Sequence, residues 1–164
     1  MADGVDGGGL RYNSDKAPFD MLPLRLMLEW AFVQPTEKSH PAYLILSEMA
    51  RWQEGDDQAL DIALRVTHGR FKGLAAGAQV FHDVTTRKVK PYPKWNWMRG
   101  MAWSIPLGCI IRHCLAWLDG QELDPETGLP HYGHIQCNLI MLKFYHHHFP
   151  QGDDRPVEFF KKQP

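Results

Sequence analysis

Residues 104–148 read SIPLGCIIRHCLAWLDGQELDPETGLPHYGHIQCNLIMLKFYHHH. This stretch contains the clearest structural signals of the sequence. Ser104 is a residue type that caps helix N-termini, and Gly120 is a residue type that ends helices. Together they predict a helix over 105–118. After an acidic loop, apolar residues return at a spacing of three to four, which predicts a second helix over 131–148.

Three further segments upstream carry the same helical spacing of apolar residues. They are 22–33, then 42–66 with an interruption at Gly55 and an end at His68-Gly69, and finally 71–84. Pro91 and Pro93 exclude a continuous helix over 85–100, and strand-like alternation is scarce. We therefore predict an all-α bundle of about five helices, with an irregular N-terminal segment and an irregular C-terminal tail.

Two details of these helices give local expectations. In the first helix we expect burial of its large apolar residues, Leu22, Leu26, Leu28 and Trp30. Residues 52–57 and 117–122 place Trp, an acid, Gly and an acid at matching offsets, a similarity for which chance agreement is the simpler explanation and duplication the alternative. Six residues are too few to establish a repeat.

Composition limits the classes of function. With 164 residues the chain fits one domain, 1–164, in which 1–9 and 151–164 are expected to be flexible or irregular. A net charge of −1 argues against nucleic acid as a direct partner. The three cysteines lack CxxC spacing and indicate a reduced, cytoplasmic setting. The chain has neither a membrane-length apolar stretch nor the plan of a signal peptide, so no membrane is expected.

The densest group of reactive side chains lies in the loop and helix starts over 112–138. Magnesium and manganese prefer oxygen ligands, so the acids of the loop are candidate ligands. The candidates are Glu122, Asp124 and Glu126. His131, His134 and Asn138 stand at i, i+3 and i+7 and share one helix face, opposite Arg112 and His113 on the preceding helix.

A structural explanation of this stretch stays open beside the functional one. An acidic DPETG turn also connects helices well, because Asp and Thr satisfy backbone groups without any metal. The convergence of several titratable groups on one surface favours the functional interpretation, since burying them without a role costs desolvation energy.

Two other groups are candidates for substrate binding. Asn13 and Lys16 in the N-terminal turn segment suit phosphate oxygens, although a solvated loop lysine is the simpler explanation. The second group interleaves cations with aromatics, which suits a stacked base and phosphates and equally suits a basic loop packed by two core tryptophans. Its candidates are Lys88, Trp95, Asn96 and Trp97. The run His146–His148 is explained by the helix C-terminus and is not expected to bind metal.

Three blocks of the sequence resemble a known family. They are LRYNSDKAPFDMLP, YPKWNWMRGMAWS and RHCLAWLDGQELDPETGLPHYGHIQCN. The blocks and their order are similar to phage and bacterial dATP/dGTP diphosphohydrolases, relatives of the MazG-like all-α pyrophosphatases, and above all to the phage (d)GTP pyrophosphohydrolases. Gln121 departs from the pattern, which usually has an acid there, and a segment over 35–77 is inserted between the blocks.

The resemblance implies a cytoplasmic enzyme that cleaves purine nucleoside triphosphates, dGTP or GTP above all, between the α and β phosphates. It implies two or three Mg²⁺ or Mn²⁺ ions, a homodimer or homotetramer, and, in a phage, supply of dGMP for 2-aminoadenine synthesis. The inserted segment adds a second candidate set of metal ligands, consisting of Glu48, Glu54, Asp57 and Asp61.

Our hypothesis assigns metal binding to the loop acids and proton transfer to His131, His134 and His113. Two rival hypotheses remain. The pair His82-Asp83, with His68, is typical of HD-type triphosphohydrolases, which release triphosphate instead of pyrophosphate. The six tryptophans would also suit a nucleotide-binding or interaction module without turnover.

Overall fold

The computed structural model describes residues 15–32, 34–67 and 70–161. Six helices of eight or more residues account for most of this part of the chain: α1 (Leu24–Ala31), α3 (Pro41–Gln53), α4 (Gln58–Val66), α5 (Arg70–Thr86), α6 (Ser104–Leu118) and α7 (His131–His148). Short helical turns are η1 (Phe19–Met21), α2 (Pro35–Lys38), η2 (Asn96–Arg99), η3 (Pro150–Gly152) and α8 (Val157–Phe160). The described residues contain no strand, so the predicted all-α fold is confirmed.

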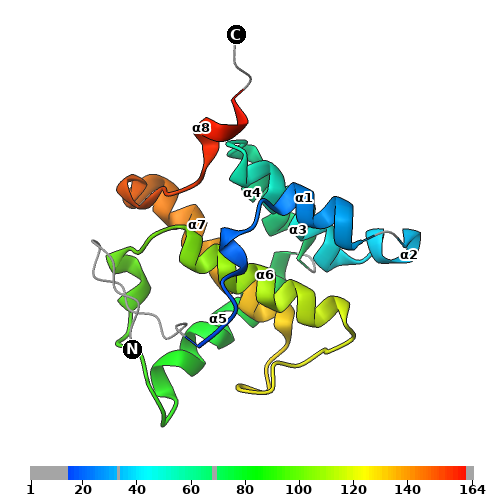
Figure 1. Ribbon diagram of the computed structural model, residues 1–164. Coiled ribbons are helices and arrows are strands. Elements are labelled where there is room, and N and C mark those ends of the chain that lie inside the picture. Colours follow the sequence, from blue (N-terminus) through cyan, green and yellow to red (C-terminus); the bar gives the residue numbers. More distant parts are fainter. Residues whose placement is uncertain (1–14, 33, 68–69, 162–164) are drawn as a thin grey trace.

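Helix α7 lies at the centre of the bundle. It forms a hairpin with α6 and also packs against α5 and α4 (Figure 1). Because neighbours surround it, α7 is buried around most of its circumference. Its first two turns bury four polar side chains besides its apolar ones, namely His131, His134, Gln136 and Asn138. Buried polar groups need partners, and the partners of these residues define the site described below.

Helices α5 and α7 approach closely because small residues face each other. A Cβ on Gly133 of α7 would lie 3.1 Å from the backbone oxygen of Ala76 on α5. A Cβ on Gly77 of α5 would lie 3.2 Å from Cγ of Gln136. Larger side chains at these positions would separate the two helices, since packed interiors hold no spare volume.

Helices α1, α3 and α4 form the other part of the bundle, with α3 packed against α1, α4 and α6. The indoles of Trp52 in α3 and Trp103 before α6 stack at 5.9 Å between ring centroids, and both are buried. Burial of a large side chain of this kind contributes about 1.5–3 kcal/mol of stability. Across the described residues, no helix has both the length and the apolar character that crossing a membrane requires.

The expected burial along the first helix is wrong for three of its four residues. Leu28 is buried as predicted, together with Leu24, but Leu26 and Trp30 are 61% and 83% exposed, and Leu22 is also exposed. Pro23 is the N-cap, and the helix turns the face of Leu24 and Leu28 toward the core. Residues two positions away on a helix lie on nearly opposite faces, which leaves the other stripe outside.

The two similar helix ends are capped in the same way. Gly55 and Gly120 both have positive φ, at 108° and 88°. At each end the amide after the glycine bonds back to the helix: Asp56 N–H to the Arg51 carbonyl, and Gln121 N–H to the Ala116 carbonyl, both at 3.0 Å. This is the Schellman arrangement, in which glycine is favoured because it has no Cβ. A shared capping requirement therefore explains the sequence similarity without a duplication.

Candidate active site

A cavity of about 860 Å³ opens between the N-terminal segment, α5, the loop after α5, α6, α7 and the loop that connects α6 to α7. Its size lies in the range of about 300–1,000 Å³ that is usual for small-molecule sites. Polar residues from all these parts of the chain line it, including Lys16, Lys88, Arg112, His113, Asp124, His134 and Asn138. The structure thus brings together candidates that the sequence spreads over 123 positions, from residue 16 to residue 138.

The loop between α6 and α7 has a fixed shape. Asp124 N–H donates to the Leu129 carbonyl at 2.8 Å, and Gly128 N–H donates to the Asp124 carbonyl at 2.7 Å. The Asp124 carboxylate also accepts from the backbone N–H and the hydroxyl of Thr127, at 3.1 and 2.9 Å. The DPET turn therefore orients the carboxylate and, because it connects the hairpin, holds it beside the facing helices.

Three side chains form a group of donor atoms suited to a metal ion. His113 of α6, Asp124 of the loop and His131 of α7 each offer one atom, and these atoms lie within 4.8 Å of one another. Nδ1 of His113 lies 2.9 Å from Nδ1 of His131. Ligand atoms in neighbouring positions of an octahedral ion with bonds of about 2.1 Å are about 3 Å apart, so the spacing of the two histidine nitrogens fits a small divalent cation.

Neighbouring side chains set the tautomers of two histidines. Nε2 of His131 lies 2.9 Å from the amide oxygen of Gln121, which accepts only, so this nitrogen carries the proton and Nδ1 keeps its lone pair. The Thr127 hydroxyl donates its single proton to Asp124, so at 2.9 Å it accepts from Nε2–H of His134. Such outer partners orient metal-binding imidazoles in proteins.

Burial keeps the imidazoles of this group neutral. Desolvation is the largest cause that lowers the pKa of His113, which lies well below its usual value, and of His131 and His134. The Asp124 carboxylate partly offsets the lowered pKa of His131 and His134. The ring of His113 also stacks on that of His134, with 4.4 Å between centroids. Neutral imidazole is the form that binds a metal or accepts a proton.

The three loop acids that were predicted as metal ligands have different surroundings in the structure. Asp124 belongs to the donor group, whereas Glu122 is exposed and Glu126 forms an ion pair with Lys16 at 3.3 Å. The backbone carbonyl of Glu122 accepts from the amide of His131 at 3.1 Å. Two of the three histidines that were assigned to proton transfer, His113 and His131, therefore lie with Asp124 in the group that suits a metal.

The candidate substrate-binding residues lie around the same cavity, apart from Asn13, which is outside the described residues. Arg112 donates to Cys109 Sγ at 3.1 Å and to the Ala17 carbonyl at 3.5 Å, which ties α6 to the N-terminal segment. The side chain of Asn138 donates to the His134 carbonyl at 2.8 Å. Among the other lining candidates, Lys88 and Trp95 are exposed, Trp97 is half-buried and Asn96 is buried.

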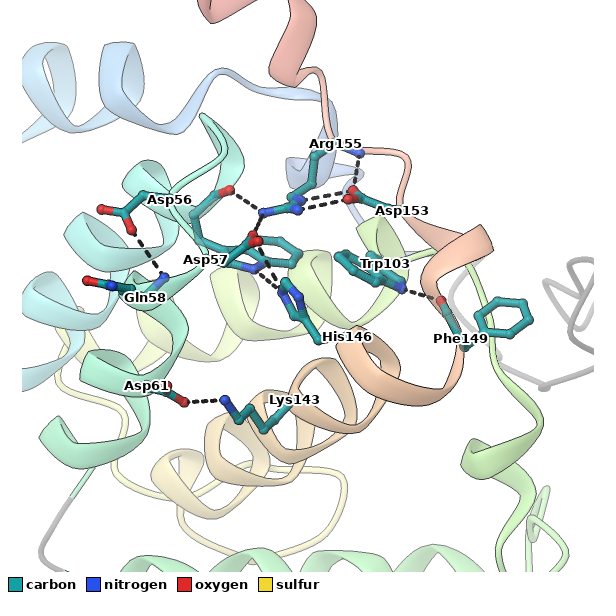
Figure 2. A network of polar contacts seen from close by, with 11 residues as sticks. Asp56, Asp57, Gln58, Asp61, Trp103, Lys143, His146, Phe149, Asp153 and Arg155 are labelled. Atoms are coloured by element: carbon teal, nitrogen blue, oxygen red, sulfur yellow. Dashed lines mark hydrogen bonds and ion pairs between the residues drawn. The ribbon is translucent and has the colours of Figure 1, made fainter.

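The second carboxylate set forms ion pairs elsewhere in the molecule. Glu48 pairs with Arg51, Glu54 with Arg25, Asp57 with Arg155 and Asp61 with Lys143, at 2.9, 2.6, 2.8 and 2.7 Å. Figure 2 shows the last two pairs, in which Asp57 is the N-cap residue of α4 and Asp61 lies in its first turn. Within the part of the chain that is described, the only group of side chains found with donor atoms close enough to hold a metal ion is the one at the α6–α7 hairpin.

The HD pair lies apart from the donor group. His82 is exposed on α5 and lines the cavity, Asp83 is half-buried, and neither belongs to the group of three donors. His68, the third residue of that hypothesis, lies outside the described residues.

The sequence predicted only a turn-forming role for Thr127 and no role in the site for Gln121, whereas the two side chains contact His134 and His131. The Asp-x-x-Thr spacing of the loop was a usable signal for Thr127, since this spacing lets a hydroxyl and a carboxylate share a turn. The position of Gln121 directly after the helix-ending Gly120 was a weaker signal, because its direction depends on the cap.

A comparison with known protein families matches the part of the chain that contains the donor group. A family model described as "dATP/dGTP diphosphohydrolase, N-terminal" matches residues 53–155, which is more than half of the chain. Comparisons with curated proteins and with solved structures gave no match. The matched region runs from the end of α3 to Arg155 and therefore contains the whole donor group.

Proposed function

Because the chain belongs to the dATP/dGTP diphosphohydrolase family, we propose that it hydrolyses purine deoxynucleoside triphosphates between the α and β phosphates with the help of a divalent cation. The observation that carries this proposal is the donor group of His113, Asp124 and His131 beside a cavity of nucleotide size. A nitrogen-containing donor set suits Mn²⁺ or another first-row transition ion better than Mg²⁺.

The bound cation and the residues around the cavity would have different roles in the reaction. A bound cation supplies neutralisation of the triphosphate and a lowered pKa of its water. Lys16 and Arg112 add positive charge on the side of the N-terminal segment, where it favours an anionic ligand. These side chains would hold the triphosphate against the hairpin.

His134 is the residue we propose as general base. Its Nε2–H is held by Thr127, which leaves the lone pair on Nδ1 to take a proton from water. The water oxygen bonds to the α phosphorus, the bond from the α phosphorus to the bridging oxygen breaks, and pyrophosphate leaves with that oxygen. The products are a deoxynucleoside monophosphate and pyrophosphate.

The finer assignment concerns the base and the pathway. We propose that guanine nucleotides are preferred and that the dGMP produced feeds synthesis of 2-aminoadenine nucleotides in a phage. The similarity of the three sequence blocks to phage (d)GTP pyrophosphohydrolases supports this assignment. Turnover of dGTP and dATP compared side by side at equal concentration tests the preference.

The main proposal is tested by identifying the reaction products and by comparing the turnover of variants with that of the wild type. The protein is incubated with each dNTP and Mn²⁺, and the products are resolved by chromatography. We expect dNMP and pyrophosphate, and a loss of turnover of about 100-fold or more in His131→Ala and Asp124→Asn, since each removes a donor. His147→Ala, an exposed change outside the cavity, is the control and should match the wild type.

Other products identify the rival hypotheses. Release of nucleoside and triphosphate would identify HD-type chemistry. Absence of turnover with every dNTP and divalent cation would identify a binding module. Full turnover in both donor variants would contradict the role of the donor group.

A further inference from the structure

The loop after α5 forms a fixed wall of the cavity. Tyr92 N–H donates to the Val84 carbonyl at 2.7 Å, which closes the loop at its base. Nε of Arg87 donates to the Lys90 carbonyl at 2.9 Å, and its guanidinium lies 5.0 Å from the centre of the Tyr92 ring. These contacts hold the loop in one shape and present its last residues, up to Trp95, to the cavity.

Trp95 has a backbone conformation that does not suit tryptophan. It is the third residue of a turn in which Asn96 N–H donates to the Pro93 carbonyl at 3.0 Å. Its φ of 63° and ψ of 14° lie in the left-handed region, where this turn position normally carries Gly or Asn. A tryptophan here therefore has a conformational cost that its surroundings must offset.

Packing does not offset this cost. Trp95 is 57% exposed, and its ring is contacted by the neighbouring Lys94, whose Nζ lies 5.5 Å from the ring centroid. An exposed contact of this kind is weak, and burial in the core does not explain the presence of the indole. Trp97, two residues later, is different, because its ring packs against Phe81 and Phe144 at 5.1 and 5.0 Å between centroids. Trp97 is thus explained by the fold, whereas Trp95 is explained by neither backbone preference nor packing.

A ligand that stacks on the indole would account for Trp95. The residue lines the same cavity as His113 and Asp124 of the donor group, so one nucleotide can contact both walls. We propose, on the basis of the proposed function, that Trp95 is the surface on which the purine base of the substrate stacks. A bicyclic purine overlaps more of an indole than a pyrimidine does, so Trp95 also favours purine over pyrimidine substrates.

The test measures binding without turnover. Titration calorimetry with Mn²⁺ present compares α,β-methylene dGTP, α,β-methylene dCTP and inorganic triphosphate. In Trp95→Asn we expect dGTP-analogue affinity to fall about 5- to 150-fold, with a smaller fall for the dCTP analogue and none for triphosphate. Trp95→Phe keeps a stacking ring and should stay within a few-fold of the wild type.

A stability measurement and a control make the test specific. Because Asn suits the left-handed conformation, Trp95→Asn should unfold at a temperature equal to or above that of the wild type. Trp30→Asn, at an exposed position of α1 outside the cavity, should bind all three ligands as the wild type does.

Three results would overturn the proposal. Unchanged dGTP-analogue affinity in Trp95→Asn, with normal binding by the wild type, overturns the stacking role alone. A lower unfolding temperature of that variant, with triphosphate binding weakened equally, assigns Trp95 to the fold instead. If the wild type binds no nucleotide, the proposed function fails as well.

Discussion

The imidazole of His146 accepts a hydrogen bond from the indole nitrogen of Trp52 at 2.9 Å, so Nε2 carries the lone pair. The ring lies beside Trp103, with 4.4 Å between centroids, and Nε2 is 3.9 Å from the Asp57 carboxylate. Burial is the largest cause that lowers the pKa of His146, and Arg155 lowers it further, while Asp57 acts in the opposite direction. Protonation of Nε2 would remove the acceptor that Trp52 uses.

We predict that His146 makes the folded state less stable in acid. The unfolded chain binds a proton near the usual histidine pKa of about 6.5, whereas the folded chain resists it. The contribution is therefore complete above that pH and is lost as the pH falls below it. Urea unfolding at about pH 8 and about pH 5.5 should show a smaller decrease in stability for His146→Gln than for the wild type. Equal decreases in the two proteins would show that His146 does not titrate in this way.

Sequence reasoning at the residue scale identified residue types better than roles. The positions of His113, Asp124 and His131 were all predicted as part of the site. Their division into ligands and bases was a separate prediction, and it depends on which side chains the loop turns inward. In the structure, the backbone hydrogen bonds of the loop and the side chains of Thr127 and Gln121 orient Asp124 and His131.

At the level of the helices, α5 and α7 approach closely at Gly133. We therefore predict that replacing Gly133 by Ala lowers the stability of the fold, although helix propensity alone would favour Ala. In an open helix, Gly→Ala stabilises by roughly 0.5–1 kcal/mol. At Gly133 the new Cβ would lie 3.1 Å from the Ala76 oxygen, so overpacking should dominate and destabilise by about 1–3 kcal/mol. Chemical denaturation of Gly133→Ala measures the sign.

The same variant also tests how the helix positions the site. Gly133 lies between His131 and His134, so a displaced α7 should weaken Mn²⁺ binding along with stability. A Gly133→Ala protein that is more stable than the wild type would show that α5 and α7 have room to move apart.

The helices were largely predictable because their apolar spacing and glycine stops are local signals. All five predicted helical segments are present, with the interruption at Gly55. The short turns α2, η2 and α8 were not predicted, since elements of four residues leave no periodicity to read. The exposed stripe of α1 was not predicted either, because a short helix with apolar residues on both faces does not reveal which face is inside.

At the scale of the whole molecule, Arg155 connects the C-terminal segment to the junction of α3 and α4. Its guanidinium lies 4.7 and 5.1 Å from the ring centres of Trp52 and Trp103, and it bonds Asp57 at 2.8 Å and Asp153 at 2.8 and 2.9 Å (Figure 2). It also donates to the backbone carbonyl of Trp52 at 2.9 Å. Only 7% of this side chain is exposed.

We predict that Arg155→Ala lowers the free energy of unfolding by about 2–4 kcal/mol, through lost charged hydrogen bonds and lost stacking. Arg155→Lys should restore only part of it, because an ammonium group cannot bond in the same planar manner. Lys161→Ala, which removes an exposed pair with Glu158, is the control and should change stability by less than about 0.5 kcal/mol. Equal stability of Arg155→Ala and the control would show that this contact contributes little.

The expected homodimer or homotetramer stays a prediction at this scale. Sedimentation velocity at micromolar concentration checks it, and a single monomeric species would contradict it.

All three members of the donor group come from one helix hairpin, between residues 113 and 131. Closing so short a loop has a small entropic cost, so the group can assemble before distant parts of the chain are in place. An ion held there would link neighbouring segments of the hairpin reversibly, and its binding energy would stabilise this part of the fold. A chelator would then loosen this hairpin and leave the Arg155 contact at the far end intact.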